Sequence, residues 1–210
     1  VEASRKAQAA WGSEPPARRS HLLRKVQGLL ADRTDEFAER VSRETGKPFM
    51  ESLATDVMNA LSVGDFAASR VEHGFRESKV DFGPLSSMMR YMGRSSHLIP
   101  RPLGVIGIIA PWNYPLAIPY SQVMMSLAAG NGVLLKPSSH TPLTAVRMAE
   151  MFKEAGLPDG LLQLVIGSGS KVGEALATSG VDRIIFTGHA DVGRRIMSLA
   201  SQKLVPITLE

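Results

Sequence analysis

The sequence predicts an α/β fold, with an open parallel sheet of five strands, helices on both faces and an N-terminal helical segment before it. Five short apolar stretches occur in the last 110 or so residues, each ends at a chemically unusual residue, and segments with helical spacing lie between them. Short strands that are apolar on both faces and alternate with helices are typical of a covered parallel sheet. The expected strands are Val105–Ile109, Val133–Leu135, Leu161–Ile166, Arg183–Phe186 and Val205–Leu209.

The residues that follow these strands are expected to meet at one edge of the sheet. Right-handed crossovers bring the carboxyl ends of parallel strands to the same side, which is where such sheets bind ligands. An amide, a lysine, glycine loops and a carboxylate would therefore share one crevice. The strand ends are Pro111-Trp112-Asn113, Lys136-Pro137-Ser138-Ser139, Gly167-Ser168-Gly169, Thr187-Gly188-His189 and Glu210.

Residues 1–75 are expected to form helices that pack on this core. Apolar residues recur at i, i+3 and i+4 after Pro15-Pro16, which predicts a helix with one apolar stripe. A second helix is expected to begin at Thr34 and to stop at Gly46-Lys47-Pro48, and a third to cover Glu51–Arg70.

Residues 76–102 contain several turn-forming residues, and alternating stretches lie around Met88–Met92. This composition predicts a turn-rich connector or hairpin. The third part, residues 103–210, is the α/β core. Its crossover helices are expected at Pro115–Ala129, from a Thr141 cap to Gly156, from near Gly169 to Ser179, and after His189 to about Lys203.

Composition excludes several classes of function. The net charge of +4 is modest and the charges are interleaved, so we expect no nucleic-acid partner. The longest apolar run is short and broken by proline, and no leader peptide is visible, so we expect no membrane partner and a cytoplasmic location. The absence of cysteine excludes disulfides, thiolate metal sites and cysteine nucleophiles within these residues, and we predict no metal site.

The chain begins at Val1 and stops directly after a predicted strand. We therefore expect it to be part of a longer protein.

Two strand-end residues have clear chemical alternatives. Asn113 lies between two prolines that stiffen its loop, as an oxyanion donor requires, although an Asn chosen only for a tight turn fits equally well. Lys136 suits a ribose hydroxyl or a phosphate, whereas the alternative is a surface lysine at a strand end.

The glycines and the final glutamate are equally open to two interpretations. Gly188 and Gly193 bracket a strand-to-helix junction that could cradle a diphosphate, and Gly169 with Gly173 forms a second glycine pair, but neither has GxGxxG spacing. Glu210 ends an apolar strand, where burial would raise its pKa toward the range of a general base. The alternative is an exposed glutamate just beyond a strand.

Several segments, in order and with the expected gaps, resemble the aldehyde dehydrogenase superfamily. The similarity is strong over residues 100–210 and looser over residues 1–99, where Glu44-Thr45-Gly46-Lys47-Pro48 contributes. The main segments are Pro102–Val105, Pro111-Trp112-Asn113-Tyr114-Pro115, Ala129–Ser138, Glu154–Pro158, Phe186-Thr187-Gly188 and Thr208-Leu209-Glu210.

The resemblance implies a Rossmann-like, dinucleotide-binding core over residues 103–210 and an NAD(P)-dependent oxidation of an aldehyde to a carboxylic acid. In the family a cysteine thiolate attacks the aldehyde and a glutamate-activated water hydrolyses the thioester. By position, Asn113 would be the oxyanion donor and Glu210 the general base. The implied cofactor-binding residues are Ile109, Ala110, Pro111, Trp112, Lys136, Ser138, Ser139, Gly169, Gly173, Phe186, Thr187, Gly188, His189, Val192 and Gly193.

Three departures from the family pattern matter. This chain has no cysteine, so we expect the catalytic domain to lie outside it and these residues alone to be inactive. Many NAD-preferring members carry a glutamate where this chain has Ser139, and loss of that carboxylate predicts that NADP is tolerated or used. His189 replaces the usual serine after Thr-Gly, and its imidazole could alter diphosphate binding.

Two other functions remain open from the sequence. A reductive relative acting on acyl-CoA or acyl phosphate shares the fold but does not need the glutamate at 210. A non-catalytic dinucleotide-binding fragment fits the absence of cysteine. The expected partner is a small aldehyde, and the full-length protein is expected to be a homodimer or homotetramer.

Overall fold

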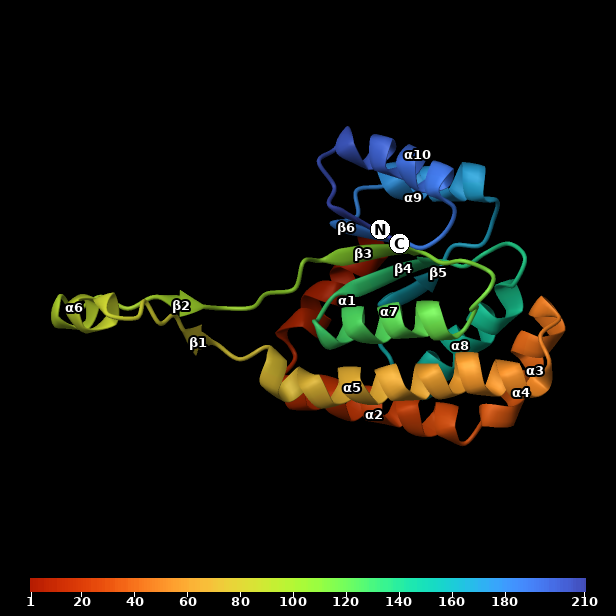
Figure 1. The fold of residues 1–210 in the computed structure, drawn as a ribbon, viewed down its shortest axis with the longest axis horizontal. Coiled ribbons are helices and arrows are strands. Elements are labelled where there is room, and N and C mark those ends of the chain that lie inside the picture. Colours follow the sequence, from red (N-terminus) through yellow and green to blue (C-terminus); the bar gives the residue numbers. More distant parts are fainter.

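The computed structural model describes residues 1–210, except for the side chain of Glu72. Its centre is a five-stranded parallel sheet in the order β5-β4-β3-β6-β7 (Figure 1). This confirms the predicted fold class; the two edge strands are shorter than expected because each has a single neighbour. The strands are β3 (Val105–Ile109), β4 (Gly132–Lys136), β5 (Leu162–Leu164), β6 (Arg183–Phe186) and β7 (Ile207–Leu209).

The strand order places a topological switch point beside the central strand. The chain runs outward through β3, β4 and β5, then returns to the other side of β3 for β6 and β7. Ile109, at the end of β3, stands opposite Lys136 of β4 and Phe186 of β6. The ends of three strands are therefore level with one another, at the position where open α/β sheets bind ligands.

Helices cover both faces of the sheet (Figure 1). Ile106, Ile108 and Leu135 belong to one apolar cluster, which includes residues of two helices on that face. Val105 and Leu134 belong to a second cluster on the other face. The alternation follows the period of two along each strand. The helices on the first face are α7 (Ala117–Ala128) and α8 (Pro142–Glu154), and on the second α9 (Glu174–Thr178) and α10 (Ala190–Ser201), which η2 (Gly169–Gly173) precedes.

Except for the first of them, the N-terminal helices form a layer outside α7 and α8 (Figure 1). Leu23, Val26 and Leu30 of α2 are fully buried, which confirms the apolar stripe expected there. The expected helix Glu51–Arg70 is divided, because a π-helical segment, η1, interrupts it. The elements are α1 (Glu2–Ser13), α2 (Pro16–Ala31), α3 (Thr34–Thr45), α4 (Phe49–Glu51), η1 (Ser52–Val57) and α5 (Met58–Gly74).

Helix α1 is an element that the sequence pattern did not single out. It packs against β3 and β4. Trp11 is buried and its indole N–H donates to the carbonyl of Leu127 at 2.9 Å. Arg5 pairs with Asp182 at 2.9 Å, and the same carboxylate accepts the backbone N–H of Val105 at 2.7 Å. These bonds fasten α1 to the end of α7 and to Asp182, which in turn holds the first residue of β3.

Residues 76–102 form an arm that extends from the body of the molecule (Figure 1). Strands β1 (Ser78–Lys79) and β2 (His97–Leu98) pair antiparallel, with α6 (Leu85–Tyr91) between them. The alternating pattern expected around Met88–Met92 is wrong, because Met88–Tyr91 is helical. The positions of Leu85, Met88, Met89 and Met92 follow the i, i+3, i+4, i+7 spacing of a helix. This spacing, and not the alternation, predicts the structure found here.

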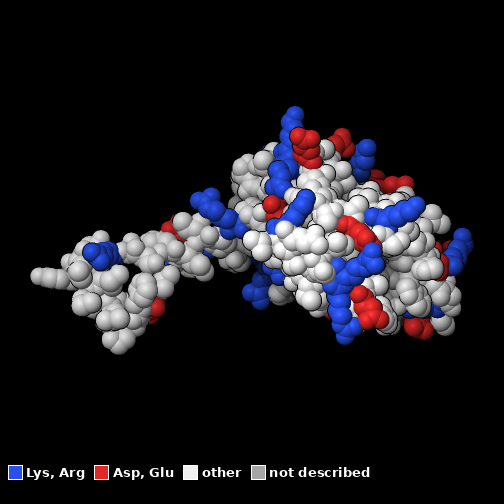
Figure 2. All heavy atoms as spheres, turned by 90° about the horizontal axis from the view of Figure 1, so that it is seen from above, with Lys and Arg blue, Asp and Glu red and all other residues white. Residues whose placement is uncertain are grey.

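Charged side chains of both signs are interspersed on the face that α9 and α10 cover (Figure 2). Arg194 pairs with Asp191 at 2.6 Å and Arg195 with Glu174 at 2.8 Å on these elements. Among the described residues, the helices are too short or too polar to cross a membrane. The cytoplasmic location stays a prediction.

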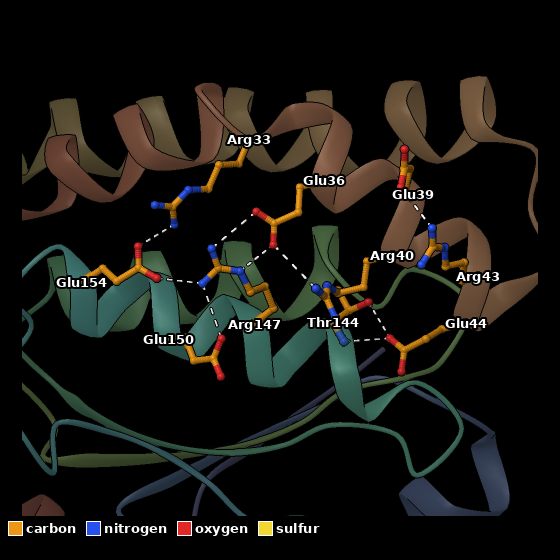
Figure 3. A network of polar contacts seen from close by, with 10 residues as sticks. All are labelled: Arg33, Glu36, Glu39, Arg40, Arg43, Glu44, Thr144, Arg147, Glu150 and Glu154. Atoms are coloured by element: carbon orange, nitrogen blue, oxygen red, sulfur yellow. Dashed lines mark hydrogen bonds and ion pairs between the residues drawn. The ribbon is translucent and has the colours of Figure 1, made fainter.

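Helices α3 and α8 are joined by a network of charged side chains (Figure 3). Arg147 of α8 binds Glu36 of α3 at 2.5 Å and Glu154 at 2.7 Å, while Arg33 reaches Glu154 at 2.6 Å. The hydrogen bond from Arg147 lowers the pKa of Glu36, and these carboxylates raise the pKa of Arg147. The network therefore stabilises the ionised forms on both helices.

Replacing Arg147 by Met should lower the free energy of unfolding by about 1 kcal/mol at neutral pH, because the pairs are partly exposed. Glu36 has a lowered pKa in the folded state, so its contribution exists above the unfolded-state value of about 4.3 and is lost as pH falls. Urea unfolding of both proteins from neutral pH to about pH 3 checks this. A difference that stays constant over that range would contradict the assignment to Glu36.

Candidate functional site

A cleft of about 660 Å³ opens at the carboxyl edge of the sheet, beside the switch point. It is bounded by the loops that follow β3, β4 and β6, by Gly169 and by the end of β7. The lining residues are Ile109, Ala110, Pro111, Trp112, Asn113, Ile118, Lys136, Ser138, Ser139, His140, Gly169, Phe186, Thr187, Gly188, His189, Val192 and Glu210. The structure thus brings together the strand-end residues that the sequence placed at one edge.

The loop after β3 presents the amide of Asn113 to the cleft. Ile109 and Ala110 are buried, and the N–H of Ala110 donates to the carbonyl of Lys136 at 3.0 Å, so sheet pairing continues one residue past the strand. Trp112 is 55% exposed and Asn113 is exposed. Within the part of the chain that the structure describes, no hydrogen bond engages the Asn113 side chain. Its amide is available to donate to a ligand.

Lys136 is buried, with only 3% of its surface exposed, which rules out the surface-lysine alternative. Its Nζ donates to the carbonyl of Pro137 at 3.0 Å. Burial lowers the pKa of this ammonium. No carboxylate among the described residues pairs with it, and an ammonium has three N–H donors. Lys136 therefore has unused hydrogen-bonding capacity at the wall of the cleft.

The loop after β6 is fixed by bonds to both neighbouring strands. The N–H of Thr187 donates to Ile109 at 3.1 Å, and that of Gly188 donates to the carbonyl of Glu210 at 3.1 Å. The hydroxyl of Thr187 accepts from Gln122 of α7 at 3.1 Å. A Cβ on Gly188 would lie 2.9 Å from the ring of Phe186. Glycine is thus required here by the close approach of that ring, whatever binds in the cleft.

Glu210 follows β7, and its N–H pairs with the carbonyl of Phe186 at 3.0 Å. One carboxylate oxygen lies 3.4 Å from the hydroxyl of Thr187. The side chain lines the cleft but is exposed. The exposed-glutamate alternative therefore describes its surroundings among these residues, and the burial expected at the end of this strand is not found.

Two predicted glycines lie behind the cleft rather than on its wall. A Cβ on Gly173 would meet Ile196 at 3.8 Å and Ile109 at 3.9 Å. A Cβ on Gly193 would meet Phe186 at 3.3 Å and Leu209 at 3.5 Å. The close approach at Gly193 leaves little room for a side chain, whereas the distances at Gly173 are those of ordinary contact. Neither glycine is among the residues that line the cleft, and their contact with a cofactor stays a prediction.

His189 occupies the N-cap of α10, where its ring replaces a hydroxyl cap. Nδ1 accepts the N–H of Asp191 at 3.3 Å. In the neutral ring this leaves the proton on Nε2, which can donate. Val192, on the first turn of α10, also lines the cleft.

Sequence reasoning missed two lining residues, Ile118 and His140. His140 follows Ser139 directly, and its N–H donates to the hydroxyl of Ser138 at 3.2 Å in a tight turn. Its place in the same loop as Ser138 and Ser139 could have identified His140 as a lining residue. Ile118 lies in the first turn of α7, close enough to Asn113 along the chain to have been considered.

Comparisons with known proteins show which family the chain resembles in sequence. The family model described as "Aldehyde dehydrogenase family" matches residues 1–210. A betaine aldehyde dehydrogenase from Vibrio vulnificus (strain CMCP6) is 35% identical over 211 residues, covering 100% of this chain and 41% of that protein. A 3,6-anhydro-alpha-L-galactose dehydrogenase from Streptomyces coelicolor is 37% identical, with the same coverage of each.

Solved structures give the same result. A putative aldehyde dehydrogenase from Burkholderia cenocepacia matches with a TM-score of 0.91 and 33% identity, covering 100% of this chain and 41% of that one. PnpE in complex with nicotinamide adenine dinucleotide matches with a TM-score of 0.91 and 32% identity, covering 100% and 42%. The chain spans about two fifths of the length of these relatives. By fold and by sequence, the chain belongs to the aldehyde dehydrogenase family.

Proposed function

We propose that the full-length protein oxidises an aldehyde to a carboxylic acid with NAD or NADP as the acceptor, and that these 210 residues supply the cofactor site, the oxyanion donor and the general base. The observation that carries the proposal is the single cleft that Asn113, Lys136, Thr187-Gly188 and Glu210 share. These groups come from four different strand ends, so their meeting is a property of the fold and not of one local motif.

The described residues fit a dinucleotide. Lys136 has N–H groups to spare and would bind the hydroxyls of the adenosine ribose. The first turn of α10 carries backbone N–H groups, of which that of Asp191 is bound by His189, and the positive end of the helix dipole, which suit a diphosphate. Phe186 and Ile109 give the cleft an apolar floor. When bound, the nicotinamide would supply the hydride acceptor.

The catalytic roles follow from the same positions. Asn113 would donate its amide N–H to the oxygen that becomes negative when a nucleophile adds to the aldehyde. Glu210 would take the proton of the hydrolytic water. The nucleophile of the family is a cysteine, and this chain contains none, so we expect the 210 residues alone to leave aldehydes unchanged.

The partners follow from the family. We expect a small aldehyde, and the names of the relatives suggest testing amino aldehydes and betaine aldehyde. A homodimer or homotetramer remains our expectation for the full-length protein. The arm of residues 76–102 exposes apolar side chains, among them Phe82, Met88 and Leu98, that would suit contact with a second copy.

The full-length protein assayed with aliphatic, aromatic and amino aldehydes should reduce NAD⁺ or NADP⁺, and one equivalent of acid should form for each nucleotide reduced. Absorbance of the reduced nicotinamide and chromatography of the acid measure the two products. Dependence on CoA or phosphate would favour a reductive relative instead. No reduction with any aldehyde and either nucleotide would refute the proposal.

Replacing Lys136 by Met should weaken binding of both nucleotides by about 10- to 100-fold, because hydrogen bonds to a charged donor are lost. The melting temperature should stay level or rise, since a buried ammonium with one partner is removed. Calorimetric titration and thermal unfolding measure the two effects. Unchanged nucleotide affinity in a folded variant would show that Lys136 faces no ligand.

Replacing Ser139 by Glu should reduce NADP⁺ affinity about tenfold or more and leave NAD⁺ affinity level or higher, because the new carboxylate repels a 2′-phosphate. Ser139 is exposed on the lip of the cleft, so the variant should fold. A Ser139→Gln variant has similar bulk without the charge and serves as the control. Equal losses in both variants would assign the effect to size.

Replacing Asn113 by Ala should lower kcat about 100- to 1000-fold, the range seen when one oxyanion donor is removed. Nucleotide affinity should change less than about twofold, because the amide is assigned to the aldehyde oxygen and not to the cofactor. Steady-state kinetics and nucleotide titration separate the two. A variant with normal kcat would leave Asn113 as a turn residue.

A further inference from the structure

The turn that ends α3 is linked to the starts of α7 and α8, two of the three helices that follow the cleft loops. Helix α3 stops at Gly46, whose φ of +78° is the left-handed conformation common at helix C-termini. On one side of this glycine, Glu44 reaches α8. On the other side, Lys47 reaches the residues that hold α7. None of these residues lines the cleft.

Glu44 caps α8. Its carboxylate accepts the N–H of Leu143 at 2.7 Å. It also accepts the N–H and the hydroxyl of Thr144, at 2.7 and 2.5 Å (Figure 3). Thr141 stands at the N-cap position but makes no side-chain cap bond, and its buried hydroxyl has no partner among the described residues. The cap expected from Thr141 is therefore supplied by a residue about 100 positions away in the sequence.

The Glu44 cap fixes the loop on the ribose side of the cleft. The loop leaves β4 at Lys136, which is buried, and enters α8 at Pro142. Ser138, Ser139 and His140 lie between these points and line the cleft. Because Glu44 holds α8 at the next two residues, both ends of this short loop are anchored.

Lys47 and Asp56 hold the start of α7 in the same way. Asp56, in η1, is fully buried and accepts the N–H groups of Leu116 and Ala117 at 3.2 Å each. Its other oxygen accepts from Lys47 Nζ at 2.9 Å. The same Nζ lies 4.0 Å from the ring centroid of Tyr114, the residue after Asn113.

We propose that the Glu44–Lys47 turn is a positioning element for the active site. Glu44 fixes the position of the loop that meets the cofactor ribose. Lys47, through Asp56 and Tyr114, fixes the position of the loop that carries Asn113. This inference rests on the proposed function. It assigns the two halves of one turn to two separable steps, cofactor binding and stabilisation of the oxyanion. A turn that served stability alone would affect both steps together or neither.

The test uses the full-length protein and separates nucleotide affinity from turnover. Glu44→Gln replaces an accepting oxygen by a donor, so at least one cap bond to α8 is lost; nucleotide Kd should rise about fivefold while kcat at saturation changes less than about twofold. Lys47→Met removes the contact to Asp56 and Tyr114; kcat should fall about tenfold with Kd within about twofold of wild type. Asp56→Asn keeps both cap bonds of α7 but weakens the contact with Lys47. If Lys47→Met does not fold, Asp56→Asn takes its place, and its kcat should fall about threefold.

Arg147→Met is the matched control, because Arg147 ties the same two helices, α3 and α8, away from the cleft (Figure 3). It should lower the melting temperature but leave Kd and kcat at wild-type values. If Glu44→Gln and Lys47→Met behave like this control, the turn is a stabilising contact only and the proposal is overturned. Parallel changes in Kd and kcat in both variants overturn it as well.

Amide hydrogen exchange gives a readout that does not need activity. Glu44→Gln should speed exchange in residues 137–144 and not in 111–118, and Lys47→Met should do the reverse. Equal effects on both segments refute the assignment even in an active enzyme. A wild-type protein that binds no nucleotide and oxidises no aldehyde ends the proposed function, and with it the assignment to cofactor and oxyanion, whatever the exchange pattern shows.

Discussion

The pairing of β3 with two neighbours at once is the constraint on which the cleft depends. Ile109 stands opposite Lys136 and Phe186, and hydrogen bonds from Ala110 and Thr187 extend this pairing beyond the strands. A one-residue slip of β3 would turn the side chains of two apolar clusters to the wrong faces. Apolar packing, and not attraction among the polar groups, therefore sets the relative positions of the strand-end residues.

The polar groups near this edge divide into two kinds. Glu44 and Asp56 each accept from backbone N–H groups that would otherwise lack partners at a helix start. Asn113 and Lys136 have donors left over within the part of the chain that the structure describes, and both line the cleft. Buried or confined polar groups are usually satisfied internally, so groups with spare capacity on a cleft wall indicate a ligand site.

The sequence predicted the sheet well because the strands are marked locally, by short apolar runs and the residues that end them. The sequence was less informative where a residue's role depends on a contact with a residue distant in the chain. It was also less informative where successive residues of a helix face different directions. Gly188 lines the cleft as expected, but the contact that requires glycine there, with the ring of Phe186, is visible only in three dimensions. Gly193 turns toward that ring while Val192 turns to the cleft, because successive helical residues differ by about 100°. The hydrogen bonds of Glu44 and Asp56 to later helices produce no periodic pattern in the sequence, so the sequence did not predict them.

The π-helical segment η1 shows how a helix can bury a carboxylate beside its apolar stripe. A regular α-helix over Glu51–Arg70 was expected, but the wider turn at Ser52–Val57 interrupts it, and such insertions are frequent at functional positions. Asp56 is fully buried there, next to the buried Val57. A lone carboxylate in that place would be costly, yet three donors meet it: two N–H groups of α7 and Lys47 Nζ. The charge and the start of α7 thus stabilise each other, so neither the helix start nor the loop before it can move without exposing an unpaired charge.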